Sequence, residues 1–165
     1  MAQTRALTIE SVVWDDPRAV ALRAAMDDEM GERYASAWDD WDPAAVEKAM
    51  KALVLDPADI HATYLAVVDG EAVGHAALRR LGSEWELKRV VTLPSHRGHG
   101  ISKALIAAVE AAAVAEGATR LILQTGDRQP EAVRLYEWLG YRGIPVYPPY
   151  DTLPMSLCFA RDLTR

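Results

Sequence analysis

The sequence predicts a single α/β domain, with a central mixed sheet of about seven strands and helices on both faces. Short segments that alternate apolar and polar residues are interspersed with longer segments of helical periodicity. Asp69-Gly70 separates two strand-like segments and is typical of a hairpin turn. A strand–helix–strand unit in the second half requires a parallel pair. The chain has 165 residues, of which 50% are hydrophobic, so one domain over residues 1–165 can bury a substantial core.

The first half predicts one strand and two helices before the hairpin. Thr8–Val13 alternates weakly and predicts a strand. Pro17 follows Asp16, a suitable N-cap, and the helix is expected to run to about Tyr34. Asp42-Pro43 repeats this signature before a second helix. The predicted apolar stripe of that helix consists of Val46, Met50, Leu53 and Val54.

Further strands are expected at His61–Val68, at its hairpin partner Glu71–Leu81 and at Trp85–Leu93. Two last strands, Tyr141–Tyr147 and Met155–Ala160, flank the stiff Pro148-Pro149 link.

The strand–helix–strand unit continues from Trp85–Leu93 into a long helix from Ile101 to about Glu116, where Gly117 provides a C-terminal cap. Leu121–Thr125 is a short apolar run typical of a buried strand, and Pro130–Leu139 is a helix closed by Gly140. The strands on either side of the long helix should therefore pair in parallel.

Composition favours a cytoplasmic protein that binds neither nucleic acid nor membrane. The formal net charge is −6, whereas nucleic-acid binding favours a broad basic face. Met1–Arg5 lacks the apolar stretch of a signal peptide, and the apolar run Ala104–Ala115 is too short to cross a bilayer. Cys158 is the only cysteine, so an internal disulfide is excluded and a reducing compartment fits. No metal is expected, because the four histidines lack ligand-like spacing.

The segment from Arg97 to Lys103 is the most informative part of the chain. Gly98 and Gly100 lie where a strand turns into a helix, and helix N-terminal amides favour an anion. Residues 88–103 carry four Lys or Arg residues and no acidic residue, which points to a phosphate-bearing ligand. A plain turn is the alternative. The spacing matches neither a dinucleotide-binding loop nor a P-loop.

Two motifs at the appropriate separation resemble the GNAT superfamily of N-acetyltransferases. Leu93–Leu105, LPSHRGHGISKAL, is similar to the family's pyrophosphate loop Arg/Gln-x-x-Gly-x-Gly/Ala, matched at Arg97, Gly100 and Ser102. Ala132–Tyr141, AVRLYEWLGY, is similar to its Ala-x-x-Leu-Tyr-x-x-x-Gly-Phe helix. Two positions depart from the pattern and one is variable. Ser102 replaces the usual Gly or Ala, Gln129 stands where Asn is frequent, and His99 fills a variable position.

The resemblance implies transfer of an acetyl group from acetyl-CoA, as co-substrate, to a primary amine. It also implies that the strand before the loop splays from its parallel neighbour and pairs with the pantetheine arm, with the N–H of Thr92 polarising the thioester carbonyl. The residues expected to contact the coenzyme are Val91, Thr92, Leu93, Arg97, Gly98, His99, Gly100, Ile101, Ser102 and Gln129.

The resemblance assigns Tyr136 as the acid that protonates the departing thiolate, although its helical face also suits a core aromatic. Glu86 is the candidate base, because strand alternation places it on the side of Thr92 and the acetyl site. Lys88 shares that side, so an ion pair is an equal alternative for Glu86. A water relayed to a backbone carbonyl is a third candidate for the base.

An acceptor site is expected near the run Trp38-Asp39-Asp40-Trp41-Asp42, where two indoles and three carboxylates could hold a cationic amine. Helix capping and packing explain the same run without a ligand. Tyr150, in the stiff segment after Tyr147, could line the acceptor pocket or belong to a hairpin turn. A small cationic amine is the preferred acceptor. The alternatives are a protein lysine or N-terminus, and a non-catalytic acyl-CoA-binding module. Family members are commonly dimers, so a homodimer is compatible with the resemblance.

Overall fold

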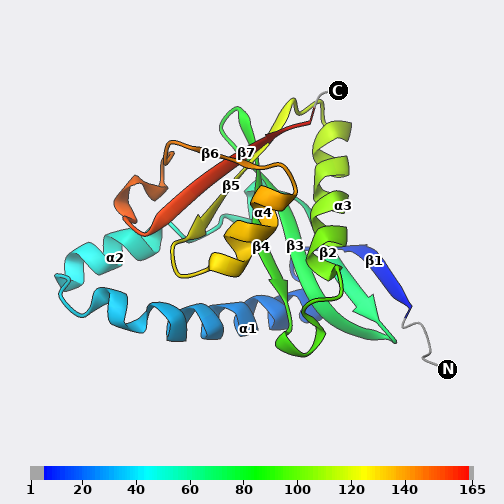
Figure 1. Ribbon diagram of the computed structural model, residues 1–165, viewed down its shortest axis with the longest axis horizontal. Helices are drawn as coiled ribbons and strands as arrows, with labels where there is room; N and C mark the ends of the chain where they lie inside the picture. Colours follow the sequence, from blue (N-terminus) through cyan, green and yellow to red (C-terminus); the bar gives the residue numbers. More distant parts are fainter. Residues whose placement is uncertain (1–5, 164–165) are drawn as a thin grey trace.

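A computed structural model describes residues 6–163 of the chain. The leader prediction on Met1–Arg5 lies outside the described residues. Seven strands form one sheet in the order β1-β2-β3-β4-β5-β7-β6, and only the β4–β5 pair is parallel. Helices cover both faces of this sheet (Figure 1). The predicted mixed α/β architecture is therefore confirmed.

The elements follow the predicted order. The strands are β1 Leu7–Val12, β2 Ile60–Val68, β3 Glu71–Leu81, β4 Glu84–Thr92, β5 Arg120–Gly126, β6 Arg142–Ile144 and β7 Ser156–Asp162. The α-helices are α1 Pro17–Tyr34, α2 Pro43–Lys51, α3 Ile101–Ala115 and α4 Pro130–Trp138. Four single turns of 3₁₀-helix connect them, η1 Ala35–Trp38, η2 Pro57–Asp59, η3 Pro94–His96 and η4 Tyr150–Thr152.

Side-chain caps fix the starts of the first two helices as the sequence predicts. The Asp16 carboxylate accepts a hydrogen bond from the backbone N–H of Arg18 at 2.9 Å. Asp42 accepts from the backbone N–H groups of Ala44 and Ala45 at 3.1 and 3.3 Å. Each cap satisfies amides that the helix itself leaves without partners.

Two expectations about local structure are wrong. Helix α2 ends at Lys51, and of its predicted apolar stripe Met50, Leu53 and Val54 are 47%, 36% and 72% exposed. These side chains line a cavity instead of packing into a core. The predicted strand Tyr141–Tyr147 shortens to Arg142–Ile144, because only these residues pair with β7.

Each face of the sheet has its own core. Helix α3 packs on one face, where Leu105, Ile106 and Val109 are fully buried together with Leu121 and Leu123 of β5. Helix α1 packs on the other face through Ala19 and Leu22, against Leu65 and Val91. Figure 1 shows α1 crossing one side of the sheet while α3 stands beside β2 and β3.

Strands β4 and β5 separate after a short parallel contact. Their register pairs Glu86 with Ile122 and Leu87 with Leu123, and no pairing extends to Val91 or Thr92. A bulge in β4 accompanies the separation, because Ala77 pairs with Lys88 whereas His75 pairs with Val91. The extra residue, Arg89, has a positive φ of 56°. The end of β4 therefore has a backbone edge without a neighbouring strand.

None of the helices within residues 6–163 is both long and apolar enough to span a membrane.

Candidate functional site

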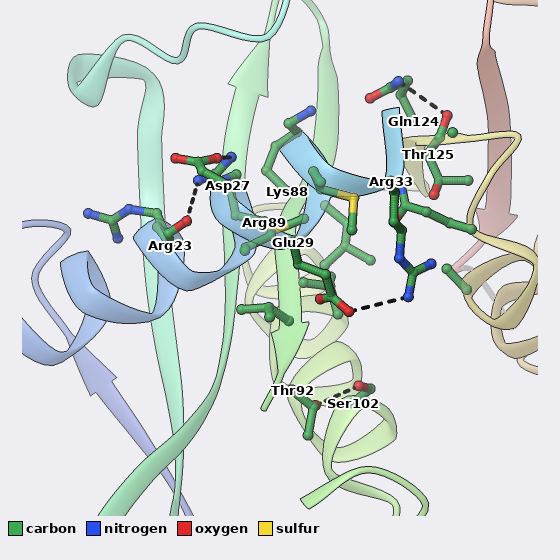
Figure 2. A pocket seen from close by; sticks show the side chains of 18 of the residues that line it. Arg23, Asp27, Glu29, Arg33, Lys88, Arg89, Thr92, Ser102, Gln124 and Thr125 are labelled. Atoms are coloured by element: carbon green, nitrogen blue, oxygen red, sulfur yellow. Dashed lines mark hydrogen bonds and ion pairs between the residues drawn. The ribbon is translucent and has the colours of Figure 1, made fainter. Parts of the chain in front are cut away.

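One large cavity of about 1270 Å³ lies at the opening between β4 and β5. Helix α1, the end of β4, the start of α3, the end of β5 and helix α4 all contribute to its lining. Figure 2 shows side chains of α1, β4, β5 and α3 that line it. The two segments that carry the sequence motifs therefore meet at one site.

The turn into α3 presents backbone amides to this cavity. Gly98 and Gly100 have φ values of 81° and 76°, a left-handed conformation in which other residues are strained. The first helical bond runs from the N–H of Ala104 to the carbonyl of Gly100. Within the described part of the chain, none of the amides of residues 98–103 donates to a protein acceptor. This helix start is therefore ready for an anion.

The end of β4 is tied to the start of α3. The hydroxyls of Thr92 and Ser102 share a hydrogen bond of 2.8 Å (Figure 2). The N–H of Leu93 donates to the carbonyl of Val73 in β3 at 2.8 Å. Because backbone groups alternate along a strand, the N–H and C=O of Thr92 face the opposite edge, toward the opening. The Thr92 N–H is thus oriented into the cavity that opens between β4 and β5.

Arg97 holds this corner together instead of extending freely toward a ligand. Its Nε donates to the Thr92 carbonyl at 2.9 Å, and its two terminal nitrogens bond the Glu29 carboxylate at 2.9 and 2.7 Å. The pKa of Glu29 is lowered mainly by the hydrogen bonds from Arg97. Arg97 therefore links α1 to the end of β4.

Most residues expected to contact the coenzyme line the cavity. Leu93 and His99 do not. Leu93 packs with both cores, and His99 is exposed in the turn. The residues that do line the cavity are Val91, Thr92, Arg97, Gly98, Gly100, Ile101, Ser102 and Gln129.

Tyr136 of α4 lies between the core and the cavity. It is 7% exposed, and its ring stacks edge-on against Tyr141 with centroids 5.8 Å apart. It also lines the cavity, and its hydroxyl bonds no other described residue. Burial raises the pKa of this phenol, so it carries its proton at neutral pH. Both sequence interpretations, core aromatic and proton donor, fit this position.

Glu86 lies on the predicted face of β4, but the expectation that it looks into the acetyl site needs correction. Its carboxylate accepts hydrogen bonds from Arg79 Nε at 2.7 Å, from the Tyr147 hydroxyl at 2.6 Å and from the Tyr150 hydroxyl at 3.2 Å. The side chain is 0% exposed and does not line the cavity. The β6–β7 connection covers it, so this geometry argues against a role as base.

Tyr150 is equally enclosed. Its hydroxyl accepts from Arg79 at 3.0 Å and from Lys88 Nζ at 2.7 Å, and it donates to Glu86. The residue is 0% exposed and does not line the cavity. The expectation that Tyr150 contacts the acceptor therefore lacks structural support. Tyr150 instead connects η4 to β4 in the protein interior through its hydrogen bonds to Glu86 and Lys88.

The two indoles of the Trp38–Asp42 run have different positions. Trp38 ends η1 and lines the cavity, whereas Trp41 lies outside it and contacts Trp38 edge-on at 5.2 Å. Asp39 and Asp40 are exposed, and Asp42 caps α2. The carboxylates of this run therefore do not surround a ligand.

Hydrogen bonds that join Arg23, His75 and Arg89 support the bulge in β4. No pattern in the sequence predicts them. Arg23 donates from Nη1 to His75 Nε2 at 3.0 Å, and because a guanidinium can only donate, Nε2 must be an acceptor. The proton of the neutral ring is then on Nδ1, which donates to the Arg89 carbonyl at 2.8 Å. Burial lowers the pKa of His75 to about 4, so the ring is neutral.

Three further residues that line the cavity were not predicted as site residues from the sequence. They are Lys88, Lys103 and Trp138. Trp138 is 69% exposed and has Lys103 Nζ 4.9 Å from its ring centroid, at the opening between α3 and α4. Lys88 is 7% exposed, and burial is the main cause that lowers its pKa to about 8. Periodicity could place these side chains on a face but not in a shared cavity. The residues from 6 to 163 contain no cluster of three His, Cys, Asp or Glu suited to a metal ion.

A parallel strand pair that opens beside a helix start with unpaired amides defines an α/β domain built to hold an anionic ligand. The chain belongs to the Acetyltransferase (GNAT) family, whose model matches residues 22–141.

One curated relative and two solved structures that resemble this chain are consistent with its membership of the family. A Klebsiella pneumoniae structure, provisionally described as an acyl-CoA N-acyltransferase, has a TM-score of 0.74 and 29% identity over 96% of this chain and 98% of that one. The IAA acetyltransferase of Azospirillum brasilense is 32% identical over 54% of this chain and 59% of its own length. The chain thus spans little more than half of this curated relative. A GNAT acetyltransferase from Elizabethkingia anophelis with acetyl-CoA bound shares the fold, with a TM-score of 0.63 and 16% identity over 94% of this chain and 97% of that one.

Proposed function

We propose that this protein is an N-acetyltransferase that moves the acetyl group of acetyl-CoA to a primary amine by direct attack. The observation that carries the proposal is the row of amides at residues 98–103, which have no protein acceptors and of which all but His99 belong to residues that line the cavity. A coenzyme diphosphate provides the anion that such a row favours. Family membership makes acetyl-CoA the natural ligand, since the related Elizabethkingia structure holds it.

The remaining parts of the coenzyme have suitable partners along the cavity. The open edge at Thr92 can pair with the amide groups of the pantetheine arm, and the Thr92 N–H can polarise the thioester carbonyl. Ser102 keeps its hydroxyl on Thr92, so it contributes by fixing the strand to the helix. At the outer end, the Trp138 ring suits stacking with adenine, and Lys103 suits a phosphate.

The chemical step conserves every atom. The neutral amine attacks the thioester carbonyl carbon, a C–N bond forms and the C–S bond breaks. The thiolate takes a proton from the Tyr136 hydroxyl. When the amide forms, the nitrogen loses a proton, which a water molecule passes back to Tyr136. Glu86 has no part in this scheme because its oxygens are occupied and buried. Water is therefore the proposed acceptor of the proton that the ammonium ion loses before it attacks as a neutral amine.

A small-molecule amine remains the proposed acceptor. Aliphatic amines reach the site as ammonium ions, so the acceptor is cationic before it reacts. Trp38 can contact such a group from η1, although Asp39 and Asp40 do not line the cavity. A protein lysine or N-terminus is the alternative acceptor of the same chemistry.

The test measures coenzyme A release from acetyl-CoA with a panel of amines. Tyr136→Phe should lower kcat by about ten- to a hundredfold while acetyl-CoA affinity by calorimetry stays within about twofold. Tyr64→Phe, a tyrosine outside the cavity, is the matched control and should retain activity. Acetyl-CoA binding without release for any amine would replace this proposal with an acyl-CoA-binding module.

A further inference from the structure

Lys88 is a buried cation that faces the cavity without an anionic partner. Its Nζ donates to the Tyr150 hydroxyl at 2.7 Å and lies 4.7 Å from the centroid of that ring. It forms no ion pair with any carboxylate of residues 6–163. An ammonium has three donors, and only one is used here. Such a group is costly to bury unless something from outside completes its shell.

The nearest carboxylate is already committed. Glu86 lies two residues away on the same side of β4, but its oxygens bond Arg79, Tyr147 and Tyr150. The Tyr150 hydroxyl has used both its donor and its acceptor capacity, so it cannot neutralise Lys88.

Arg89, the next residue on β4, adds to the positive charge. Its Nη1 pairs with Asp27 at 2.7 Å and its Nη2 donates to the Arg23 carbonyl at 3.1 Å, whereas its Nε is buried without a partner. Figure 2 shows Lys88 directed away from Thr92 and Ser102, toward the part of the cavity remote from the coenzyme turn. Positively charged side chains therefore outnumber carboxylates in the part of the cavity lining around Lys88.

The surrounding surface is apolar. Residues from α1, η1, α2, the segment after α2 and the β6–β7 connection line the same cavity, and α2 packs against η4, which carries Tyr150. They are Met30, Trp38, Met50, Leu53, Leu153 and Met155. Met50 and Leu53 are partly exposed although they are large and apolar, which suits contact with a ligand body.

We propose that the acceptor is an amino carboxylic acid with an apolar side chain, whose carboxylate binds the Lys88 ammonium. This substrate class rests on the proposed function, because the acceptor must meet the acetyl group at the Thr92 end of the same cavity. The carboxylate accepts hydrogen bonds from the unused donors of Lys88. The side chain of the acceptor covers the apolar surface formed by Met30, Trp38, Met50, Leu53, Leu153 and Met155. The amine is left free to meet the acetyl group within the same cavity.

The experiment compares matched acceptors that differ only in the carboxylate. Phenylalanine, leucine, methionine and tryptophan are each assayed against their carboxamides for coenzyme A release. The best acid should exceed its amide in kcat/KM by at least about tenfold, as expected for a charge-assisted contact. In Lys88→Met this ratio should fall to about one, mainly through a higher KM for the acid.

Lys48→Met is the matched control, because Lys48 is exposed on α2 and does not line the cavity. Its acid-to-amide ratio should equal that of the parent protein. Lys88→Gln is a second variant in case the Met substitution fails to fold, and thermal unfolding checks both. Equal use of acids and amides by the parent protein, or a ratio that survives in both Lys88 variants, overturns the assignment.

A separate binding measurement distinguishes this inference from the proposed function. Calorimetry measures N-acetylphenylalanine and N-acetylleucine binding to the coenzyme A complex of the parent protein and of the Lys88 variants. If no amine releases coenzyme A, acetyl transfer is overturned, and the Lys88 assignment then depends on this measurement alone. Loss of at least about tenfold in affinity on Lys88 substitution supports it, and unchanged or undetectable binding in all proteins overturns it.

Discussion

His75 donates from Nδ1 to the carbonyl oxygen of Arg89 at 2.8 Å, across the bulge where β4 turns away from β5. Arg89 has a positive φ of 56°, which is unfavourable for a side chain of this size. A partly buried hydrogen bond from the neighbouring strand compensates for part of this strain. The geometry of the open edge at Thr92 therefore depends on a histidine in β3 that lies outside the cavity lining.

Removing the His75 donor should disturb the open edge of β4. We expect His75→Phe to lower the free energy of unfolding by about 1–3 kcal/mol, because the Arg89 carbonyl and the Arg23 guanidinium both lose a buried partner. We also expect kcat to fall by about tenfold while acetyl-CoA affinity changes less, since the turn at residues 98–103 is untouched. Urea denaturation and steady-state kinetics measure the two effects.

His75→Asn is the matched variant, because its side-chain amide can still donate to the Arg89 carbonyl. It should recover most of the kcat that His75→Phe loses. Equal losses of kcat in both variants would show that ring packing, and not the hydrogen bond, is what matters at this position.

Stability should fall in mild acid because of the same histidine. Its pKa is about 4 in the folded protein against 6.5 for an unperturbed histidine, so the unfolded chain binds more protons between these values. The stability that the neutral ring provides is thus complete above pH 6.5 and lost as the pH falls through 4. The largest change from this group is about 3 kcal/mol.

The pH effect is isolated by a difference measurement. Urea unfolding across this pH range is compared between the parent protein and His75→Asn, whose position 75 does not titrate. The parent should show the steeper decline toward low pH. Parallel stability curves would refute the assignment of the titration to His75.

A negative charge at the start of α3 should weaken coenzyme binding. Ser102→Glu places a carboxylate among the unpaired amides and removes the bond to Thr92, so acetyl-CoA affinity should fall by at least about tenfold. Ala107→Glu adds the same charge at an exposed position of the same helix, outside the cavity, and should bind normally. Calorimetric titration with acetyl-CoA distinguishes them, and similar affinities for both variants would exclude this turn as the phosphate site.

Gly126 permits the close approach of α1 to the end of β5. A Cβ there would meet the Tyr34 hydroxyl, whose oxygen accepts from the Arg128 N–H at 3.0 Å. We expect Gly126→Ala to lower the free energy of unfolding by about 1–3 kcal/mol through overpacking. Gly143→Ala is the control, because its Cβ meets no atom within 4 Å.

The clash can be assigned with a double variant. Tyr34→Phe removes the hydroxyl that Gly126→Ala would press against, so the two changes together should cost less than their sum. Additive losses of stability, measured by urea denaturation, would mean that Gly126 acts through something other than Tyr34.

The local sequence determined most of the elements and the glycine turn that precedes α3. Asp16 and Asp42 begin their helices as predicted, because capping depends on residues only two or three positions apart. Gly98 and Gly100 mark the turn for the same reason, since a positive φ is a property of one residue. The motif at Ala132–Tyr141 includes Tyr136, which lines the cavity, and its role as proton donor stays a prediction.

Tertiary structure alone decided what the side chains on β4 meet. Strand alternation put Glu86 and Lys88 on one side, but only the docking of the β6–β7 connection buries Glu86 under Tyr147 and Tyr150 and leaves Lys88 at the cavity. The hydrogen bonds of His75 to Arg23 and Arg89 span 52 and 14 residues of sequence. Hydrophobic periodicity and secondary-structure propensity act over a few residues. Burial and electrostatic partners depend instead on which distant segments pack together. This packing is the reason why the Glu86 carboxylate is occupied, whereas the Lys88 ammonium is available to a ligand.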